Sequence, residues 1–86
     1  MKRALRIDRP ASGLYAPRPV RVRAVDGAPR SVGGVRVDST REEWLVEDRW
    51  WTSEPLRRHY LELVLENGRC TVVFRDLVSG RWWEQR

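Results

Sequence analysis

Cysteine is almost absent from this chain, which has 86 residues, one cysteine (Cys70) and one histidine (His59). A single cysteine forms no disulfide within the chain, and one cysteine with one histidine is too small a ligand set for a zinc site. The cysteine content gives no sign of an oxidising compartment, so we expect a reduced bacterial cytoplasm. The sequence predicts no metal site and no cofactor.

Long hydrophobic runs are also missing. No stretch approaches the ~20 apolar residues of a membrane span, and residues 1–10 lack the apolar core of a secretion signal. We therefore expect a cytoplasmic protein without membrane contacts, either a monomer or a homodimer. A single domain of this length buries about 60–65% of the surface of its unfolded chain, which leaves little room for a deep active site.

Residues suited to catalysis are few. His59 has no serine or cysteine at a spacing typical of a nucleophile motif, and Cys70 falls on the predicted core face, where a thiol packs as a small apolar group. One cluster of acidic residues could bind a divalent metal or act in acid–base chemistry, although such clusters more often solvate a surface. It comprises Asp38, Glu42, Glu43, Glu47 and Asp48. The sequence predicts that the protein is not an enzyme.

Basic residues are abundant and unevenly placed. Residues 1–36 carry nine basic and two acidic side chains, a net charge of +7, whereas residues 37–86 carry eight and ten, a net charge of −2. This asymmetry favours a first segment that meets a polyanion or the acidic face of a partner protein. A solvated basic tail is the alternative interpretation.

The pattern along the chain is typical of β-strands. Residues 1–17 mix basic side chains with Pro10, Ser12, Gly13 and Pro17, and predict a flexible basic N-terminal arm before a single β domain at 18–86. From Pro19 the period is two, with valines facing one way and Arg21 and Arg23 the other. Gly33-Gly34 predicts a bulge or sharp bend, and a third strand over 43–51 places Trp44 and Val46 on one face.

Asn67-Gly68 predicts a β-hairpin with a two-residue type I′ turn. That turn sets Leu65 opposite Cys70, and it places six side chains on one buried face: Leu61, Leu63, Leu65, Cys70, Val72 and Phe74. The chain then reverses through Ser79-Gly80, where we expect Asp76 to cap the turn and Gly80 to supply a positive φ.

The expected architecture is all-β. Five or six short strands, with at most one helical turn near Glu54 to Arg58, predict a small antiparallel SH3-like or OB-like barrel or a strongly bent sheet.

Two Trp-Trp doublets in arginine-rich settings give the first candidate site. Neighbouring residues in a strand point to opposite faces, so each doublet sends one indole toward solvent. We expect Trp44, Trp50 and Trp82 to lie in the core and Trp51 and Trp83 to be exposed. The candidate partner-binding surface comprises Trp51, Trp83, Trp50, Arg57, Tyr60 and Arg75.

The second candidate site is basic. Arg21, Arg23 and Arg36 alternate with valines, which places the guanidinium groups on one outer face where phosphates bind. With an exposed indole nearby, this face predicts weak, sequence-tolerant binding of single-stranded nucleic acid. Pairing of these arginines with the acidic third strand is the alternative.

Five segments occur in an order and spacing that carry a family resemblance: Arg18-Pro-Val-Arg-Val, Asp48-Arg-Trp-Trp, Arg57-Arg-His-Tyr, Val73-Phe-Arg-Asp and Ser79-Gly-Arg-Trp-Trp. Over residues 18–85 the chain resembles a small bacterial domain family of unknown function, the module at the C-terminal end of mutasome-type, catalytically inactive Y-family polymerase homologues.

The resemblance implies an adaptor role beside damage-induced, error-prone DNA synthesis, in which a polymerase-like subunit contacts partner proteins. This chain departs from that pattern because it has no polymerase region. The resemblance implies no catalytic residues, and it offers one possible signature surface: Trp50, Trp51, Arg57, Tyr60, Arg75, Asp76, Trp82 and Trp83. The sequence therefore predicts a protein-interaction adaptor module, with single-stranded nucleic-acid binding as the alternative.

Overall fold

The computed structural model describes residues 16–48, 53 and 55–85, and within them it contains seven β-strands and no helix. All pairings are antiparallel, in the order β1-β7-β6-β5-β4-β3-β2. The strands are β1 (Arg18–Pro19), β2 (Val22–Val25), β3 (Ala28–Val32), β4 (Val35–Asp48), β5 (Leu56–Leu65), β6 (Cys70–Asp76) and β7 (Trp82–Gln85). Among these residues no helix could cross a membrane.

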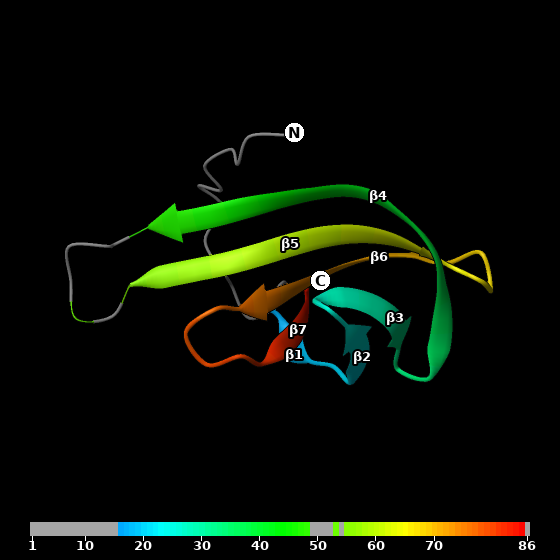
Figure 1. Ribbon diagram of the computed structural model, residues 1–86, viewed down its shortest axis with the longest axis horizontal. Coiled ribbons are helices and arrows are strands. Elements are labelled where there is room, and N and C mark those ends of the chain that lie inside the picture. Colours follow the sequence, from blue (N-terminus) through cyan, green and yellow to red (C-terminus); the bar gives the residue numbers. More distant parts are fainter. Residues whose placement is uncertain (1–15, 49–52, 54, 86) are drawn as a thin grey trace.

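The sheet is strongly bent and forms a half-barrel (Figure 1). The bend lies in β4, a strand of 14 residues whose pairing with β5 shifts between Val37 and Ser39 and again between Thr40 and Glu42. Such bulges increase the local twist and turn the strand. As Figure 1 shows, β2 and β3 consequently fold back beneath β5 and β6. The all-β prediction is confirmed, with seven strands where five or six were expected.

Apolar side chains are packed on both faces of the sheet. Inside the bend, Leu61, Leu63, Leu65, Val32 and Val73 form one buried cluster. On the opposite face, Val46, Tyr60 and Phe74 form a second cluster, with Trp44 and Trp83 packed against it. β5 and β6 bury residues on both faces, which accounts for their short runs of consecutive apolar residues, Leu63–Leu65 and Val72–Phe74.

Two tight turns bound β3, a strand over Ala28–Val32 that was not predicted. Asp26 and Gly27 have φ values of 52° and 81°, and Gly33 and Gly34 have values of 56° and 86°. Positive φ at both central residues defines a type I′ turn, which matches the twist of a hairpin. Gly33-Gly34 is therefore a hairpin turn between β3 and β4 and not a bulge, and Asp26-Gly27 joins β2 to β3.

The predicted register of the Asn67-Gly68 hairpin is wrong by one residue. Cys70 lies opposite Val64, because the loop contains three residues, 66–68. The amide of Gly68 donates to the Leu65 carbonyl at 2.9 Å, the Arg69 amide donates to Asn67 Oδ1 at 3.0 Å, and Gly68 has a φ of 88°. A turn followed by a glycine in the left-handed region is the three-residue alternative to type I′.

This shift exchanges the faces of the sheet on which the side chains of β6 lie. Val73 and Thr71 face the cluster inside the bend, Phe74 faces the opposite cluster, and Cys70 is exposed instead of buried. The predicted single face of six apolar residues is therefore divided between two faces of the sheet.

The ends of β5 and β6 give mixed outcomes. The helical turn expected near Glu54 to Arg58 is wrong over Leu56–Arg58, which is extended and paired with β4; Glu54 lies outside the described residues. The expected turn after β6 is confirmed. The Asp76 carboxylate accepts hydrogen bonds from the amides of Val78 and Ser79 at 2.8 and 3.1 Å, and Gly80 has a φ of 80°.

Candidate functional site

Three arginines lie together on the outer side of β2, β3 and the start of β4, a surface that we call the basic face. Arg23 pairs with Ser31 of β3, and Ser31 pairs with Arg36 of β4. Directly opposed residues in antiparallel strands point to the same face, so Arg23 and Arg36 flank Ser31. The carbonyl of Arg21 accepts a hydrogen bond from the Gly33 amide at 2.8 Å, which holds Arg21 in line with Arg23.

Valines fix this orientation. Val32 is buried with 4% exposure, and its register partners Val22 and Val35 pack against the same cluster. Because successive residues of a strand point to opposite sides, the residues beside these valines must face outward. The prediction that Arg21, Arg23 and Arg36 share an outer sheet face agrees with this geometry.

The guanidinium groups of the basic face are available to a ligand. Residues two apart in a strand are separated by about 7 Å, and residues two strands apart by about 10 Å. All three arginines are exposed, and in the part of the chain that the structure describes none of them forms an ion pair. Pairing with the acidic third strand, the alternative weighed above, is not observed.

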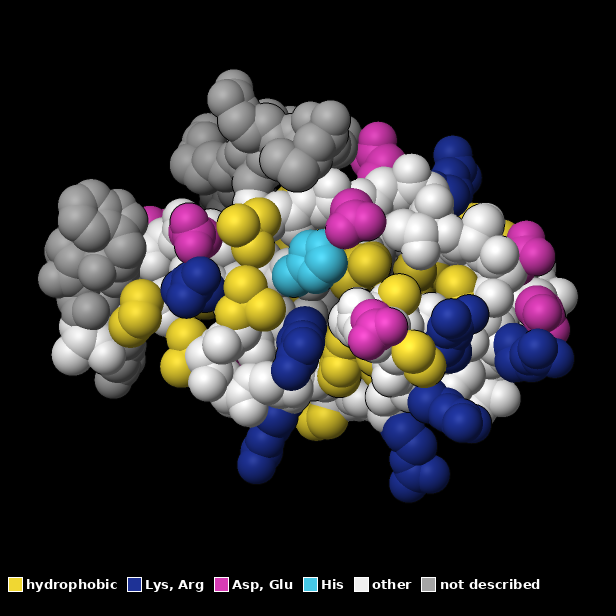
Figure 2. Space-filling view, in the orientation of Figure 1, with side chains coloured by type: hydrophobic (Ala, Val, Ile, Leu, Met, Phe, Trp, Pro, Cys, Tyr) yellow, Lys and Arg dark blue, Asp and Glu magenta, His cyan; other side chains and the backbone are white. Residues whose placement is uncertain are grey.

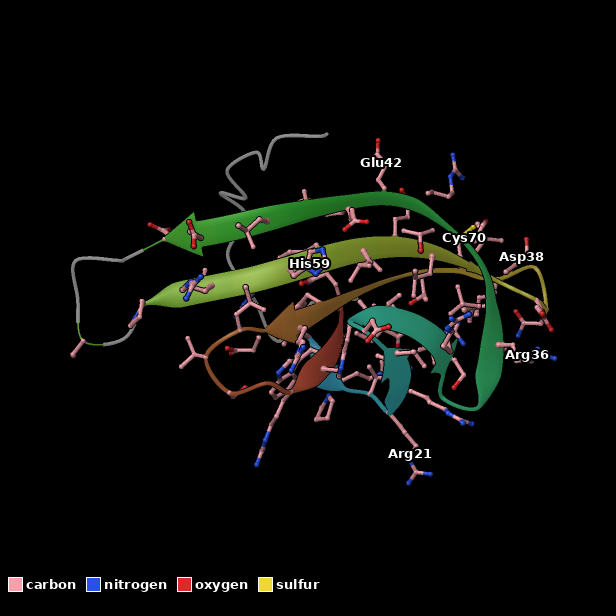
Figure 3. All side chains as sticks on the ribbon, in the orientation of Figure 1. Arg21, Arg36, Asp38, Glu42, His59 and Cys70 are labelled. Carbon is pink, nitrogen blue, oxygen red and sulfur yellow. The ribbon has the colours of Figure 1, made fainter. Side chains whose placement is uncertain are left out.

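The distribution of charge over the surface agrees with this assignment. Figure 2 shows arginine side chains gathered along the lower right margin, over β2, β3 and the start of β4. In Figure 3, Arg21 and Arg36 extend away from the sheet. Arg30 of β3 is also exposed beside Ser31, and the sequence analysis missed it. The Asp26-Gly27 hairpin signal could have revealed it, because that hairpin brings β3 against β2.

The four candidate partner-binding residues that the structure describes are not brought together. Tyr60 and Trp83 lie on the face of the second cluster, and Tyr60 is only 3% exposed. Arg57 and Arg75 are exposed on the opposite face, and Arg57 pairs with Glu47 at 3.0 Å. Trp50 and Trp51, the remaining two candidates, lie outside the described residues.

The indoles of β7 and β4 are partly exposed. Trp82 packs against the cluster inside the bend, as expected of a core residue. Trp83 was expected to be exposed but is half-buried, because its ring stacks on Phe74 with centroids 6.5 Å apart. Trp44 is also half-buried and stacks on Tyr60 at 5.4 Å. Among the described tryptophans none stands free of the cores.

An arginine that sequence reasoning missed completes the second cluster. The Arg58 guanidinium lies over the Phe74 ring, 4.4 Å from its centroid, and Arg58 Nη1 donates to the Tyr60 hydroxyl at 3.2 Å. Arg58 and Tyr60 share a face because they are two residues apart in β5. The buried Nε of Arg58 has no hydrogen-bond partner. Arg58 is therefore packed as part of the second cluster.

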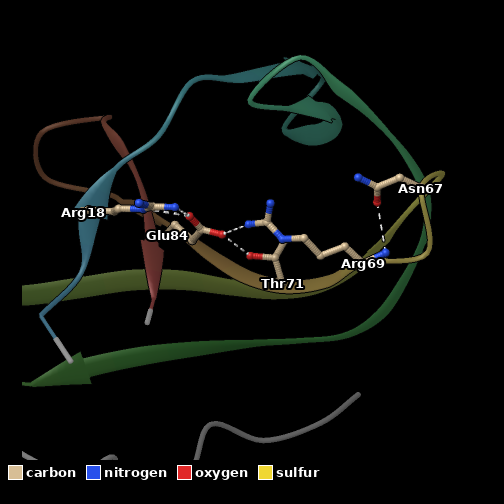
Figure 4. A network of polar contacts seen from close by, with 5 residues as sticks. All are labelled: Arg18, Asn67, Arg69, Thr71 and Glu84. Atoms are coloured by element: carbon tan, nitrogen blue, oxygen red, sulfur yellow. Dashed lines mark hydrogen bonds and ion pairs between the residues drawn. The ribbon is translucent and has the colours of Figure 1, made fainter. Parts of the chain in front are cut away.

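Among the described residues, Glu84 is the charged residue that is buried, with 6% exposure, and the sequence analysis did not single it out. It lies two residues from Trp82 in β7 and therefore on the inner face, a spacing that could have predicted its burial. As Figure 4 shows, Arg18 and Arg69 pair with its carboxylate at 3.0 and 2.6 Å, and the Thr71 hydroxyl donates to it at 2.6 Å.

The environment of Glu84 favours its charged form. Burial alone raises the pKa of this carboxyl, but the hydrogen bonds from Thr71 and Arg18 and the charges of Arg69 and Arg18 outweigh it, so the pKa lies below its usual value. All four residues come from different strands or turns: β1, the β5–β6 connection, β6 and β7. The network therefore ties both ends of the domain together and is structural.

The remaining chemical candidates stay apart. His59 Nε2 lies 2.9 Å from Glu43 Oε1 across β4 and β5, and both are partly exposed. Within residues 16–48, 53 and 55–85, no group of three or more His, Cys, Asp or Glu side chains is placed to hold a metal ion. The acidic residues predicted as a group are instead spread along β4, as the labels of Asp38 and Glu42 in Figure 3 illustrate.

Comparison with known proteins gave no relative. The chain matches no protein-family model, no curated protein and no solved structure. The resemblance to the mutasome module stays a prediction from the sequence motifs.

Proposed function

We propose that this domain binds single-stranded nucleic acid, with the basic face contacting the phosphate backbone. The observation that carries the proposal is the register row of Arg23, Ser31 and Arg36, continued by Arg21, in which no guanidinium has a protein partner among the described residues. Arginine is well suited to phosphate because its planar donors match two phosphate oxygens.

The chemistry of this face predicts binding that weakens with salt and depends little on the base sequence of the nucleic acid. Arginine contacts to phosphates carry no base information, and no described indole stands beside the basic face to stack a base. Each phosphate contact on a single strand contributes about 0.7 to the slope of log affinity against log salt. Such a function agrees with the role in DNA-damage tolerance that the family resemblance implies.

Salt titration tests the proposal. With three contacts, the affinity for a fluorescent single-stranded oligonucleotide should fall about 20-fold between about 50 and 200 mM salt. In the variant Arg23→Ala/Arg36→Ala the fall should shrink to about 3-fold, because one contact remains. Fluorescence anisotropy measures both.

A charge-matched control separates the basic face from overall charge. Arg41 and Arg75 are exposed on β4 and β6, and neither forms an ion pair with another described residue. Arg41→Ala/Arg75→Ala removes the same charge and should keep the steep salt dependence. If the two double variants lose the same affinity, or if the wild type does not bind at low salt, the proposal is wrong.

A further inference from the structure

One long edge of the sheet has, over part of its length, no partner strand among the described residues. β3 pairs with β4 only at Val35 and Arg36, whereas β5 pairs with β4 as far as Asp48. Beyond Arg36, the other side of β4 faces no strand among the described residues, and in Figure 1 it forms the upper margin of the sheet. Alternate amide and carbonyl groups of such an edge point outward and can pair with another chain.

The regular part of this edge has a distinctive side-chain pattern. Glu43, Leu45 and Glu47 share one face and are all exposed, with Leu45 at 41%. Trp44 and Val46 share the opposite face and belong to the second apolar cluster. Residues 43–47 follow the last shift in register with β5, so this stretch is free of bulges. The edge therefore offers acid–apolar–acid on one face and apolar side chains on the other.

The acidic side chains retain capacity for a ligand. Glu43 contacts His59 through Oε1 and Glu47 contacts Arg57 through Oε2, while the side chains of Glu43 and Glu47 are 56% and 48% exposed. A carboxylate accepts several hydrogen bonds through two oxygens. Each glutamate can therefore accept a further cationic donor from the open side of the strand.

The same charges exclude one occupant. If two copies of β4 paired antiparallel about Leu45, Glu43 of each copy would lie opposite Glu47 of the other. Like charges directly opposite each other destabilise an antiparallel pair. The two glutamates therefore disfavour pairing of two copies through this edge and favour a partner strand of opposite charge.

We propose that Glu43–Glu47 is a docking edge for an extended segment of a protein partner, which adds to β4 as an antiparallel strand. The segment carries basic–apolar–basic residues on the face of Leu45, where they meet Glu47, Leu45 and Glu43 in turn. It carries apolar residues on the face of Trp44 and Val46. Main-chain hydrogen bonds supply the attachment and the two glutamates supply the selectivity. This surface gives the predicted adaptor role a site distinct from the basic face.

The test is an NMR titration of the full chain with a short capped peptide whose centre reads Arg-Val-Leu-Val-Arg. We expect saturable shifts of the backbone amides of Glu43–Glu47 at peptide concentrations up to about 1 mM. A peptide with Glu-Val-Leu-Val-Glu at its centre should bind the wild type at least about 10-fold more weakly, because it sets like charges opposite each other.

A charge exchange keeps the test decisive. Glu43→Arg/Glu47→Arg should lose the basic peptide and bind the acidic one, whereas the matched control Asp38→Arg/Glu66→Arg, with the same charge change elsewhere, should behave as the wild type. Wild-type shifts absent from Glu43–Glu47, equal binding of both peptides, or no exchange of preference would overturn the proposal. Shifts of these amides with protein concentration alone would also overturn it, because they would identify a second copy as the occupant.

Discussion

Replacing Phe74 with alanine should lower the free energy of unfolding by about 3–5 kcal/mol, the usual cost of removing a buried phenylalanine ring. Phe74 is 1% exposed, and its ring packs on Tyr60 with centroids 4.8 Å apart and on Trp83 at 6.5 Å. The Arg58 guanidinium covers the same ring. A domain of this size has roughly 4–13 kcal/mol of stability in total, so the expected loss is about a quarter of that stability or more.

Urea and thermal unfolding measure this effect. Each kcal/mol corresponds to about 4–8 °C in a domain of this size, so the expected loss in Tm is at least about 12 °C. The conservative change Phe74→Leu should cost less, because it keeps apolar volume while losing the ring under Arg58. Val78→Ala, at a side chain that is 63% exposed, should be nearly neutral. A loss below about 1 kcal/mol for Phe74→Ala would contradict the burial of the ring.

The part of β4 that packs in the same cluster as Phe74 shows how much the sequence could predict. Strand alternation correctly separated Trp44 and Val46 from Leu45 and Glu47, because period two depends only on local backbone geometry. The same alternation oriented Arg21, Arg23 and Arg36. Side-chain direction within one strand was therefore predictable.

Pairing between strands was predictable only in part. Asn-Gly suits a two-residue turn, but the Asn67 side chain bonds the Arg69 amide and the loop takes three residues, which turns β6 over. The pattern did not expose the error, since Val72, Val73 and Phe74 are consecutive apolar residues that suit either register. Expecting one buried face was the underlying mistake, because β5 and β6 pack on both.

The spacing from Trp82 could have predicted the burial of Glu84, but the residues that pair with its carboxylate were beyond the sequence analysis. A charged side chain enters a core only where partners from distant strands converge, and Arg18 and Glu84 are 66 residues apart. No local pattern encodes that meeting.

The two proposed surfaces use different parts of β4. Arg36, at the start of the strand, belongs to the basic face, and Glu43–Glu47 lie beyond the bulges that bend it. The bend separates a basic segment from an acidic one within a single strand. Because the surfaces share no residue, a nucleic acid and a protein segment would not compete for the same side chains, as an adaptor requires.

Neutralising Glu84 should destabilise the domain and change its response to acid. The side chains of Arg18 and Arg69 are 54% and 53% exposed, so water can solvate them when the carboxylate is lost. The buried Thr71 hydroxyl, in contrast, loses the charged acceptor of its hydrogen bond. We therefore expect Glu84→Gln to lower the free energy of unfolding by about 1–3 kcal/mol near neutral pH, within the range for a buried hydrogen-bonded group.

The pH dependence follows from the lowered pKa of Glu84 in the folded protein. The unfolded chain takes up a proton at this carboxyl at a higher pH than the folded protein does, so acid favours unfolding. The contribution of Glu84 is fully present above the ordinary glutamate pKa of about 4.3 and is lost as the pH falls through the folded value. Urea unfolding should show that the free energy of unfolding falls less between about pH 7 and pH 3 for Glu84→Gln than for the wild type. Glu66→Gln, at an exposed loop residue, should keep the wild-type slope. If Glu84→Gln and the wild type lose stability in parallel, the network does not hold the carboxylate in its charged form.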